Sequence, residues 1–394
     1  MFAIDNAIIQ RCLMNHFSYT TTQLAENSYL VPYGQSVADH RRTIMTNESG
    51  VLLWNAFTSG ASASEMLSLL QATYEASDED LPSLEQDVRT FMDCLEKNGI
   101  FAKSSVPHSG YPATKLAIGP VGICFHAPKS LISTYFTSFE DTAAKTECCQ
   151  DLHILPYEPF AKPNGKILTR SRDLIIFETE DAYVYLPTKS NYIYEMHVTK
   201  DAHYAYLYAD MHTENAVLLD ELFHIIRFAF LMAAQQHNLL IVHSASILYH
   251  DKAYLFSGHS GAGKSTHTNL WFKQYKTPLL NGDLNMLGIC NNKVICYGLP
   301  WCGTSNVCTS ESHASGSITF LFQATENKVR KLSFDEAVLQ LTKRCINPNQ
   351  TEQQLQKNLS LAAEICKLRP SYELCCTKDK KAVEIMRDAI NHED

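Results

Sequence analysis

One glycine-rich segment constrains the fold of this chain more than any other feature. Residues 258–266 read Gly-His-Ser-Gly-Ala-Gly-Lys-Ser-Thr and fit the pattern GxxxxGK[ST]. An apolar, strand-like run at 253–257 precedes the segment, and a helix is expected to begin at Lys264. In that setting successive backbone N–H groups and a helix N-terminus can surround phosphate oxygens. The segment therefore predicts a phosphate-binding loop that takes a nucleoside triphosphate with magnesium.

Each residue type in this loop has a physical role. The glycines allow the backbone to turn tightly, because they have no Cβ atom. Lys264 is expected to reach the β- and γ-phosphates, and the Ser265 hydroxyl is suited to ligate magnesium. The expected nucleotide-binding residues are Gly258, His259, Ser260, Gly261, Ala262, Gly263, Lys264, Ser265 and Thr266.

Two titratable residues flank the loop along the chain. Asp283 ends an apolar strand-like run, 279–283, that lies 19 residues after Lys264. A carboxylate there can hold magnesium or accept a proton from an attacking hydroxyl, and its alternative role is to cap the end of the strand. His243 stands alone in the apolar run 239–247. A single histidine in such a strand suits a buried core position and a catalytic position equally well.

A loop at 298–303 follows the two strands expected at 286–290 and 294–297. Its sequence is Gly-Leu-Pro-Trp-Cys-Gly. Its glycines and Trp301 could border the same site. A packing role for Trp301 is the equal alternative.

The first hundred residues predict a small separate domain. Two strands are expected within 28–46, with a turn at 32–34, and three helices follow. Asn47 can cap the first helix, and Ser62 with Glu65 can form a capping box for the second. The third is expected after Pro82 and ends before Gly99. These elements describe a compact winged-helix-like unit.

The charge of this region excludes one common role of such units. Residues 1–100 contain thirteen acidic and five basic side chains, so they carry nearly all of the net charge of −9. Nucleic-acid binding depends on basic side chains that displace counterions from phosphates. We therefore expect a protein or peptide partner and no nucleic acid.

Three stretches of this region resemble a known family. They are T-N-E-S-G-V-L-L-W-N-A-F from Thr46, S-A-S-E-M-L-S-L-L from Ser62 and E-Q-D-V-R-T-F-M-D-C-L-E-K-N-G-I from Glu85. Over residues 25–101 the chain is similar to the PqqD-type domain, which holds the leader segment of ribosomally made precursor peptides. The resemblance implies that the leader adds as a strand and contacts Ala38–Met45 and the helix at 84–98. An unrelated small helical domain is the alternative.

The order of His243, the loop and Asp283 resembles the HPr kinase/phosphorylase-like kinases, which share their core with phosphoenolpyruvate carboxykinases. The resemblance covers about 215–390. It implies His243, Lys264 and Asp283 as catalytic residues and Ser265 and Asp283 as magnesium ligands. ATP or GTP would be the nucleotide, with ATP the first choice. Gly282 stands where the family carries the first of two paired acids, so Asp283 serves both metal and proton, or His243 shares the role of base.

Together these patterns predict a chain of several domains that belongs to the α+β and α/β fold classes. Residues 1–101 form the PqqD-like domain, 102–214 a mixed α+β region rich in strands whose role the sequence does not indicate, and 215–394 the kinase-like domain with its phosphate-binding loop. The expected function is ATP-dependent phosphorylation of a serine or threonine hydroxyl on a leader-bound precursor peptide. A small-molecule kinase and a non-catalytic nucleotide-binding adaptor are the alternatives. The resemblance also allows a homo-oligomer.

Composition and cysteine spacing suggest the environment of the chain. The thirteen cysteines include no CxxC pair, which favours reduced thiols in a cytoplasmic protein. The first residues lack a basic segment followed by an apolar run, so no signal peptide is expected. The longest apolar stretch, 225–242, is interrupted by Arg227 and His237, so no membrane span is expected either.

Overall fold

The computed structural model describes residues 19–38, 41–59, 61, 63–77, 80–98, 100, 109–156, 165–211 and 215–392. The chain divides into two compact units, Met1–His108 and Ser109–Asp394, and each is described by itself. The expected capping residue Ser62, the expected helix stop Gly99 and most of the loop expected at 156–165 lie outside the described residues.

The first unit combines a small antiparallel sheet with helices. The sheet has the order β1-β2-β3, with β1(Tyr19–Leu24), β2(Asn27–Pro32) and β3(Ile44–Thr46). The helices are α1(Gln35–Ala38), α2(Glu48–Thr58), α3(Ala63–Thr73) and α4(Leu81–Lys97). The strand β1 was not predicted. The first predicted strand ends early, at Pro32, because the helical turn α1 forms at its expected end. The second is also shorter than expected, because residues 41–43 are irregular and β3 begins only at Ile44.

Apolar residues at helical spacing explain why these helices pack. One core contains Leu53 and Trp54 of α2, Leu70 of α3 and Phe91 of α4. As predicted, Asn47 caps α2: its side-chain oxygen accepts a hydrogen bond from the Gly50 amide at 2.9 Å.

The second unit begins with an eight-stranded sheet, where a mixed α+β region rich in strands was expected. The described residues between 109 and 211 form strands and short 3₁₀ segments but no α-helix. Its order is β4-β5-β6-β11-β10-β9-β8-β7. The strands are β4(Ala113–Ile118), β5(Val121–His126), β6(Cys148–Pro156), β7(Lys166–Arg170), β8(Leu174–Glu178), β9(Ala182–Pro187), β10(Ile193–Thr199) and β11(Tyr204–Ala209). Strand β6 runs parallel to both of its neighbours, β5 and β11. Two short 3₁₀ segments, η1(Lys129–Leu131) and η2(Thr134–Phe139), lie between β5 and β6 in sequence.

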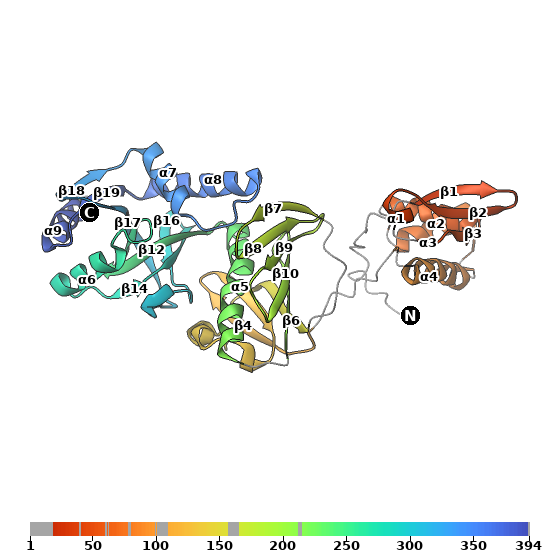
Figure 1. Cartoon of the computed structure of the whole chain (residues 1–394), viewed down its shortest axis with the longest axis horizontal. Helices are drawn as coiled ribbons and strands as arrows, with labels where there is room; N and C mark the ends of the chain where they lie inside the picture. The colour runs from red at the N-terminus through yellow and green to blue at the C-terminus, as the bar shows by residue number, and fades with distance from the viewer. Residues whose placement is uncertain are drawn as a thin grey trace. The chain divides into compact units, whose positions relative to one another are not determined.

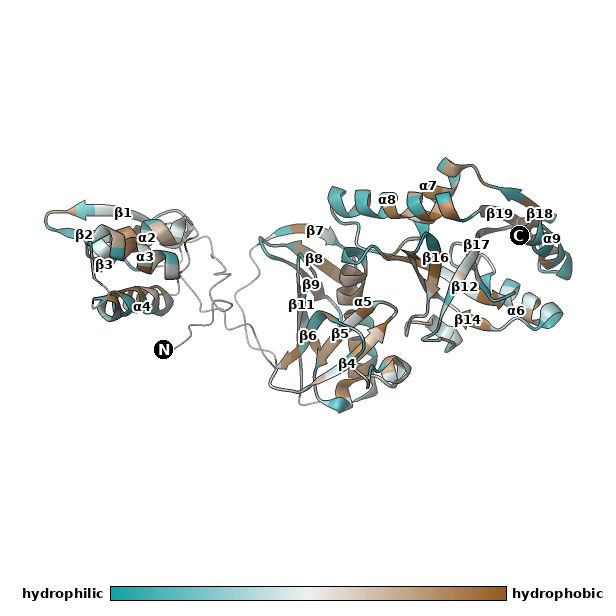
Figure 2. Ribbon diagram, turned by 180° about the vertical axis from the view of Figure 1, so that it is seen from behind, coloured by the Kyte–Doolittle hydropathy of each residue, from teal (hydrophilic) through white to brown (hydrophobic). Residues whose placement is uncertain are grey.

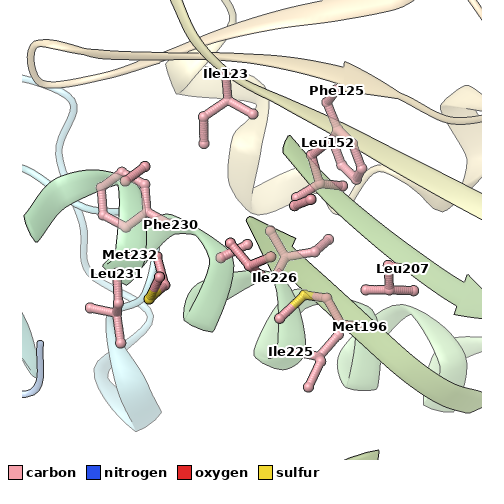
Figure 3. Close-up of a cluster of buried hydrophobic side chains, with 14 of the residues drawn as sticks. Ile123, Phe125, Leu152, Met196, Leu207, Ile225, Ile226, Phe230, Leu231 and Met232 are labelled. Atoms are coloured by element: carbon pink, nitrogen blue, oxygen red, sulfur yellow. The ribbon is translucent and has the colours of Figure 1, made fainter. Parts of the chain in front are cut away.

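Helix α5(Ala216–Gln236) covers one face of this sheet. Figure 3 shows Ile225, Ile226 and Phe230 of the helix beside Ile123 and Phe125 of β5, with Leu152, Met196 and Leu207 from neighbouring strands. The same apolar cluster continues into the strands that follow α5. The boundary expected at 214/215 therefore separates two sheets within one compact unit.

A second large sheet follows α5 (Figure 1). Its order is β13-β12-β15-β16-β17-β19-β18; β14 pairs with β12, and β13 also pairs with β17. The strands are β12(Leu240–Tyr249), β13(Lys252–Ser257), β14(Leu279–Asn281), β15(Leu284–Cys290), β16(Lys293–Tyr297), β17(Ser312–Gln323), β18(Lys328–Lys331) and β19(Ser371–Cys376). The pairing of β13 with β17 closes five of these strands into a ring.

Helices cover both faces of this second sheet. They are α6(Lys264–Tyr275), α7(Phe334–Arg344), α8(Glu352–Leu368) and α9(Lys380–Asn391). One apolar core joins the strands to α7 and α8, and another joins them to α6 and α9. In Figure 2 most of α8 and the end of α6 are hydrophilic, as expected for helices with one face in water.

Buried amides tie α5 to the second sheet. The Gln235 side chain donates to the Pro348 carbonyl and to the Asn358 side chain, both at 2.8 Å. Asn347 bonds the backbone of Leu239 and Ile241 on the entry to β12, at 2.7 Å each. These bonds fix the end of α5 and the start of the strand that carries His243.

The cysteines depart from the expectation of reduced thiols at one pair. Cys124 on β5 and Cys148 on β6 form a disulfide. Sequence spacing could not reveal it, because the two cysteines are 24 residues apart and meet only through the pairing of β5 with β6. Among the residues that the structure describes, no helix has the length and apolar character needed to cross a bilayer.

The environment of Trp301 supports the packing alternative. The indole is buried against Phe136, Phe223 and Phe230, and its N–H donates to the Phe223 carbonyl at 2.8 Å.

We predict that Trp301→Ala lowers the free energy of unfolding by about 3–5 kcal/mol, because it leaves a cavity and an unpaired carbonyl. Urea denaturation measures this loss, and Trp301→Phe should lose less. A loss below about 1 kcal/mol for the alanine variant would contradict the packing role.

Candidate functional site

The predicted phosphate-binding loop lies between β13 and α6. Strand β13 ends at Ser257 and α6 begins at Lys264. Gly261 and Gly263 have φ angles of 81° and 101°, in the left-handed region that favours glycine. A Cβ atom on Gly258 would lie 2.7 Å from the Ala262 Cβ, so a larger residue would force the loop open. The glycines of the motif are therefore required by this backbone.

Three residues predicted as catalytic meet beside this loop. The Lys264 Nζ atom lies 3.1 Å from the His243 Nε2 atom. The same Nε2 atom lies 3.1 Å from a carboxylate oxygen of Asp283. The imidazole therefore stands between an ammonium and a carboxylate. It accepts from Lys264 when Nε2 is unprotonated and donates to Asp283 when Nε2 carries a proton.

Strand pairing brings His243 and Asp283 together. Strands β12 and β15 are antiparallel, with His243 opposite Leu284, the residue after Asp283. The Ser244 amide donates to the Asp283 carbonyl at 2.9 Å. The Asn281 side chain accepts from the Asp283 amide at 2.9 Å, which fixes the turn between β14 and β15.

The charges at this site shift one another's protonation. The hydrogen bond from His243 is the main cause that lowers the pKa of Asp283. The charges of Lys264 and Arg227 add to this effect, and burial opposes it. Burial lowers the pKa of Lys264, against the attraction of Asp283. Asp283 is thus held as a carboxylate, the state that binds a cation.

The exposed side of the loop is polar. His259, Ser260, Ser265 and Thr266 are exposed, whereas Ala262 is buried. Gln323, at the end of β17, donates to the Gly261 carbonyl at 2.6 Å and so braces the loop. A shallow depression beside the first turn of α6 is lined by Ala262, Thr266, Gln323, Thr377 and Lys378.

The structure explains the glycine found where a second acid was expected. A Cβ atom on Gly282 would lie 2.2 Å from the Ser305 hydroxyl oxygen and 2.4 Å from its Cβ. Ser305 is held there because its hydroxyl donates to the Cys302 carbonyl at 2.7 Å. The neighbouring Gly303 packs directly against the Asp283 side chain. The short 3₁₀ segment η3(Gly303–Ser305) thus occupies the space of a side chain at position 282.

Sequence reasoning missed three further residues of this site. Arg227 on α5 and Arg344 at the end of α7 act electrostatically on Asp283 and Lys264, respectively. Ser305 packs on Gly282. A signal in the sequence was that Arg227 interrupts the otherwise apolar run 225–234 within α5. Nothing local marks Arg344 or Ser305, because their proximity comes from tertiary packing.

Comparisons with known proteins bear mainly on the first unit. Residues 36–100 match the family described as Coenzyme PQQ synthesis protein D (PqqD). Residues 36–100 form a PqqD domain. The PqqD-type prediction is thereby confirmed over that range, which is a minor part of the chain.

The comparisons say less about the second unit. The search of curated proteins gives no match. Among solved structures, the Hpr(Ser) kinase/phosphatase from Coxiella burnetii is 12% identical, with 39% of this chain and 95% of that chain covered and a TM-score of 0.23. A TM-score this low carries no argument about a shared fold. The kinase-like assignment therefore stays a prediction.

The contact at Gly282 gives a test of the second-acid position. We predict that Gly282→Asp destabilises the chain by about 1–3 kcal/mol, because the new side chain overlaps Ser305. Thermal unfolding measures the loss. In a Ser305→Gly background the same substitution should cost less, since the overlapping atoms are gone. Equal losses in both backgrounds would show that Ser305 is not the obstacle.

The lowered pKa of Asp283 gives a test with a definite sign. A carboxyl with a depressed folded-state pKa stabilises the fold above its unfolded pKa, about 4, and the stabilisation disappears as pH falls through the folded-state pKa. We therefore predict that Asp283→Asn melts below the parent at neutral pH and approaches it as the solution is acidified. Melting temperatures across a pH series test this. A difference that grows on acidification would contradict it.

Proposed function

We propose that this chain is an ATP-dependent phosphotransferase that modifies a hydroxyl of a precursor peptide. The observation that carries the proposal is the meeting of Lys264, His243 and Asp283 beside a glycine loop suited to phosphate. A lysine, an imidazole and a carboxylate at this place provide charge neutralisation, proton transfer and cation binding. Phosphoryl transfer requires all three.

The loop amides and Lys264 would bind the phosphates. The glycine turn and the first turn of α6 provide backbone N–H groups and the positive end of a helix dipole. Arg227 and Arg344 add positive charge near the same residues, which favours a polyanionic ligand and the charge that develops on the transferring group.

The available oxygens suit magnesium. Ser265 is exposed on the first turn of α6, and the Asp283 carboxylate is one-third exposed and ionised. Hydroxyl and carboxylate oxygens are the ligands that Mg²⁺ prefers. These two residues would hold the ion, which supplies neutralisation of phosphate charge when bound. A carboxylate with a lowered pKa is a good ligand and a weak base, so we assign Asp283 to the metal.

His243 is the better candidate for the base. In the transfer, the acceptor oxygen forms a bond to the γ-phosphorus and the bond to the bridging oxygen breaks, so that ADP leaves with that electron pair. The acceptor proton passes to His243 Nε2. Asp283, 3.1 Å away, then stabilises the imidazolium. Lys264, engaged on phosphate oxygens, leaves Nε2 open for this proton.

The PqqD domain supports a peptide as the acceptor. Its match points to a peptide-modification pathway and to a precursor peptide as partner. Strand β3 pairs only with β2 among the described strands, so its other edge offers backbone groups to an added strand. Holding the leader would raise the effective concentration of the acceptor hydroxyl, which is a weak nucleophile.

The direct test is incubation of the full chain with ATP, magnesium and the peptide encoded beside its gene. We predict that intact-mass spectrometry shows a gain of one phosphoryl group on the peptide. Removal of the leader should lower the rate, because the acceptor is then no longer held. A peptide of unchanged mass would contradict the proposal, and a loss of water would indicate elimination instead of phosphate retention.

Variants separate the roles in the same assay. Lys264→Met should lower kcat by about 100-fold or more, because an electrostatic donor to the transferring group is lost. Lys273→Met, at an exposed position of the same helix, is the matched control and should behave like the parent.

Equal rates for peptides with and without leader would favour the small-molecule alternative. ATP binding without turnover would favour the adaptor.

A further inference from the structure

A second cluster of titratable side chains lies on the first sheet of the second unit, on β5 and β6. Successive residues of a strand point to opposite faces. Figure 3 shows Ile123, Phe125 and Leu152 directed into the apolar cluster with α5. Their neighbours Cys124 and His126 on β5, and Asp151 and His153 on β6, therefore lie on the opposite face.

The parallel register places these residues in two rows. Cys124 pairs with Asp151, and His126 pairs with His153. The two imidazoles stack with ring centroids 4.2 Å apart and an interplanar angle of 9°. One ligand atom each from His126, Asp151 and His153 lies within 4.8 Å of the others. Three metal-ligand side chains are thus gathered by the backbone pairing alone.

The hydrogen bonds of His126 show why a cation belongs here. Its Nδ1 atom lies 3.2 Å from the Tyr111 carbonyl, which can only accept, so this nitrogen carries a hydrogen. In the neutral ring Nε2 then bears a lone pair. That lone pair faces a carboxylate oxygen of Asp151 at 2.9 Å. Two acceptors this close require a proton or a metal ion between them.

The arrangement around His126 is the one that metal-binding histidines use. Their second ring N–H usually donates to a backbone carbonyl or carboxylate, which fixes the tautomer and the ring orientation. Two imidazoles and a carboxylate suit Zn²⁺ and neighbouring first-row ions, whereas magnesium prefers oxygen ligands alone.

We propose that His126, Asp151 and His153 bind one divalent transition-metal ion of the Zn²⁺ class. His153 is almost fully buried, while the Asp151 side chain is 28% exposed, so the ion is reached from the Asp151 side and keeps an open position there. The site joins β5 to β6, whose parallel pairing lies one strand in from the β4 edge of this sheet. It is independent of the phosphate site and of the proposed function.

The neighbouring disulfide lies outside the proposed ligand set. Cys124 pairs with Asp151 in the same row, and the sulfurs of Cys124 and Cys148 lie close to its carboxylate. Paired sulfurs are not thiolates, and thiolates are the form in which cysteine binds metal. The assignment therefore predicts that the Cys124→Ser/Cys148→Ser chain keeps the metal.

The test is metal binding by the full, untagged chain. After treatment with a chelator, the chain is titrated with Zn²⁺ against a chromophoric competitor, and the bound metal is counted by mass spectrometry after gel filtration. We expect one equivalent in the parent chain. Asp151→Asn and His153→Asn should each weaken binding by more than about 100-fold, because losing a direct ligand costs more than losing an outer-shell partner.

Matched controls keep the result decisive. His197→Asn changes a histidine on nearby β10 that contacts Glu195, and it should bind zinc like the parent. Asp283→Asn, at the phosphate site, should also bind one equivalent of zinc. Circular dichroism of each apo variant confirms that a loss of zinc is not a loss of fold. A parent chain without stoichiometric zinc, variants that bind like the parent, or a Cys124→Ser/Cys148→Ser chain that loses the ion would each overturn the proposal.

Discussion

The antiparallel pairing of β12 with β15 is the constraint on which the candidate site depends. It sets His243 beside Asp283, and the hydrogen bond from the Ser244 amide to the Asp283 carbonyl holds that alignment. A shift of one residue would turn His243 to the other face of the sheet. Because β12 also pairs with β13, the strand that leads into the glycine loop, one strand aligns the histidine, the carboxylate and the loop.

Much of this arrangement could be predicted from sequence, because its signals are local. The glycine pattern between an apolar strand and a helix indicates the loop, and an acid at the end of a strand indicates Asp283. The rest depends on contacts between distant segments. Ser305 fills the space beside Gly282 through a fold of the chain that no spacing reveals. Strands β18 and β19 were also missed, since their short runs gave no periodic signal. Helix α9 was missed although Val383, Met386 and Ile390 recur at helical spacing after the capping residue Asp379.

The two large sheets of the second unit share one helix but differ in chemistry. Helix α5 packs its apolar side on the first sheet, and its Gln235 anchors the second through buried amide bonds. Its Arg227 adds charge at the phosphate site. The first sheet carries a polar cluster on the face away from α5, in which two histidines pair with each other and an aspartate lies in the neighbouring row. One helix thus packs on the first sheet and is hydrogen-bonded to the second, and the two sheets carry different polar side chains.

Calorimetric titration of the full chain with magnesium and ATP tests the central claim most directly, because it needs no knowledge of the acceptor. The account predicts saturable binding at one site that is strongly weakened by Lys264→Met and left unchanged by Lys273→Met. It also predicts that binding weakens when magnesium is withheld, more so in the parent than in Asp283→Asn. Absence of binding, or equal binding by the parent and Lys264→Met, would contradict the assignment of residues 258–266 as a nucleotide phosphate site.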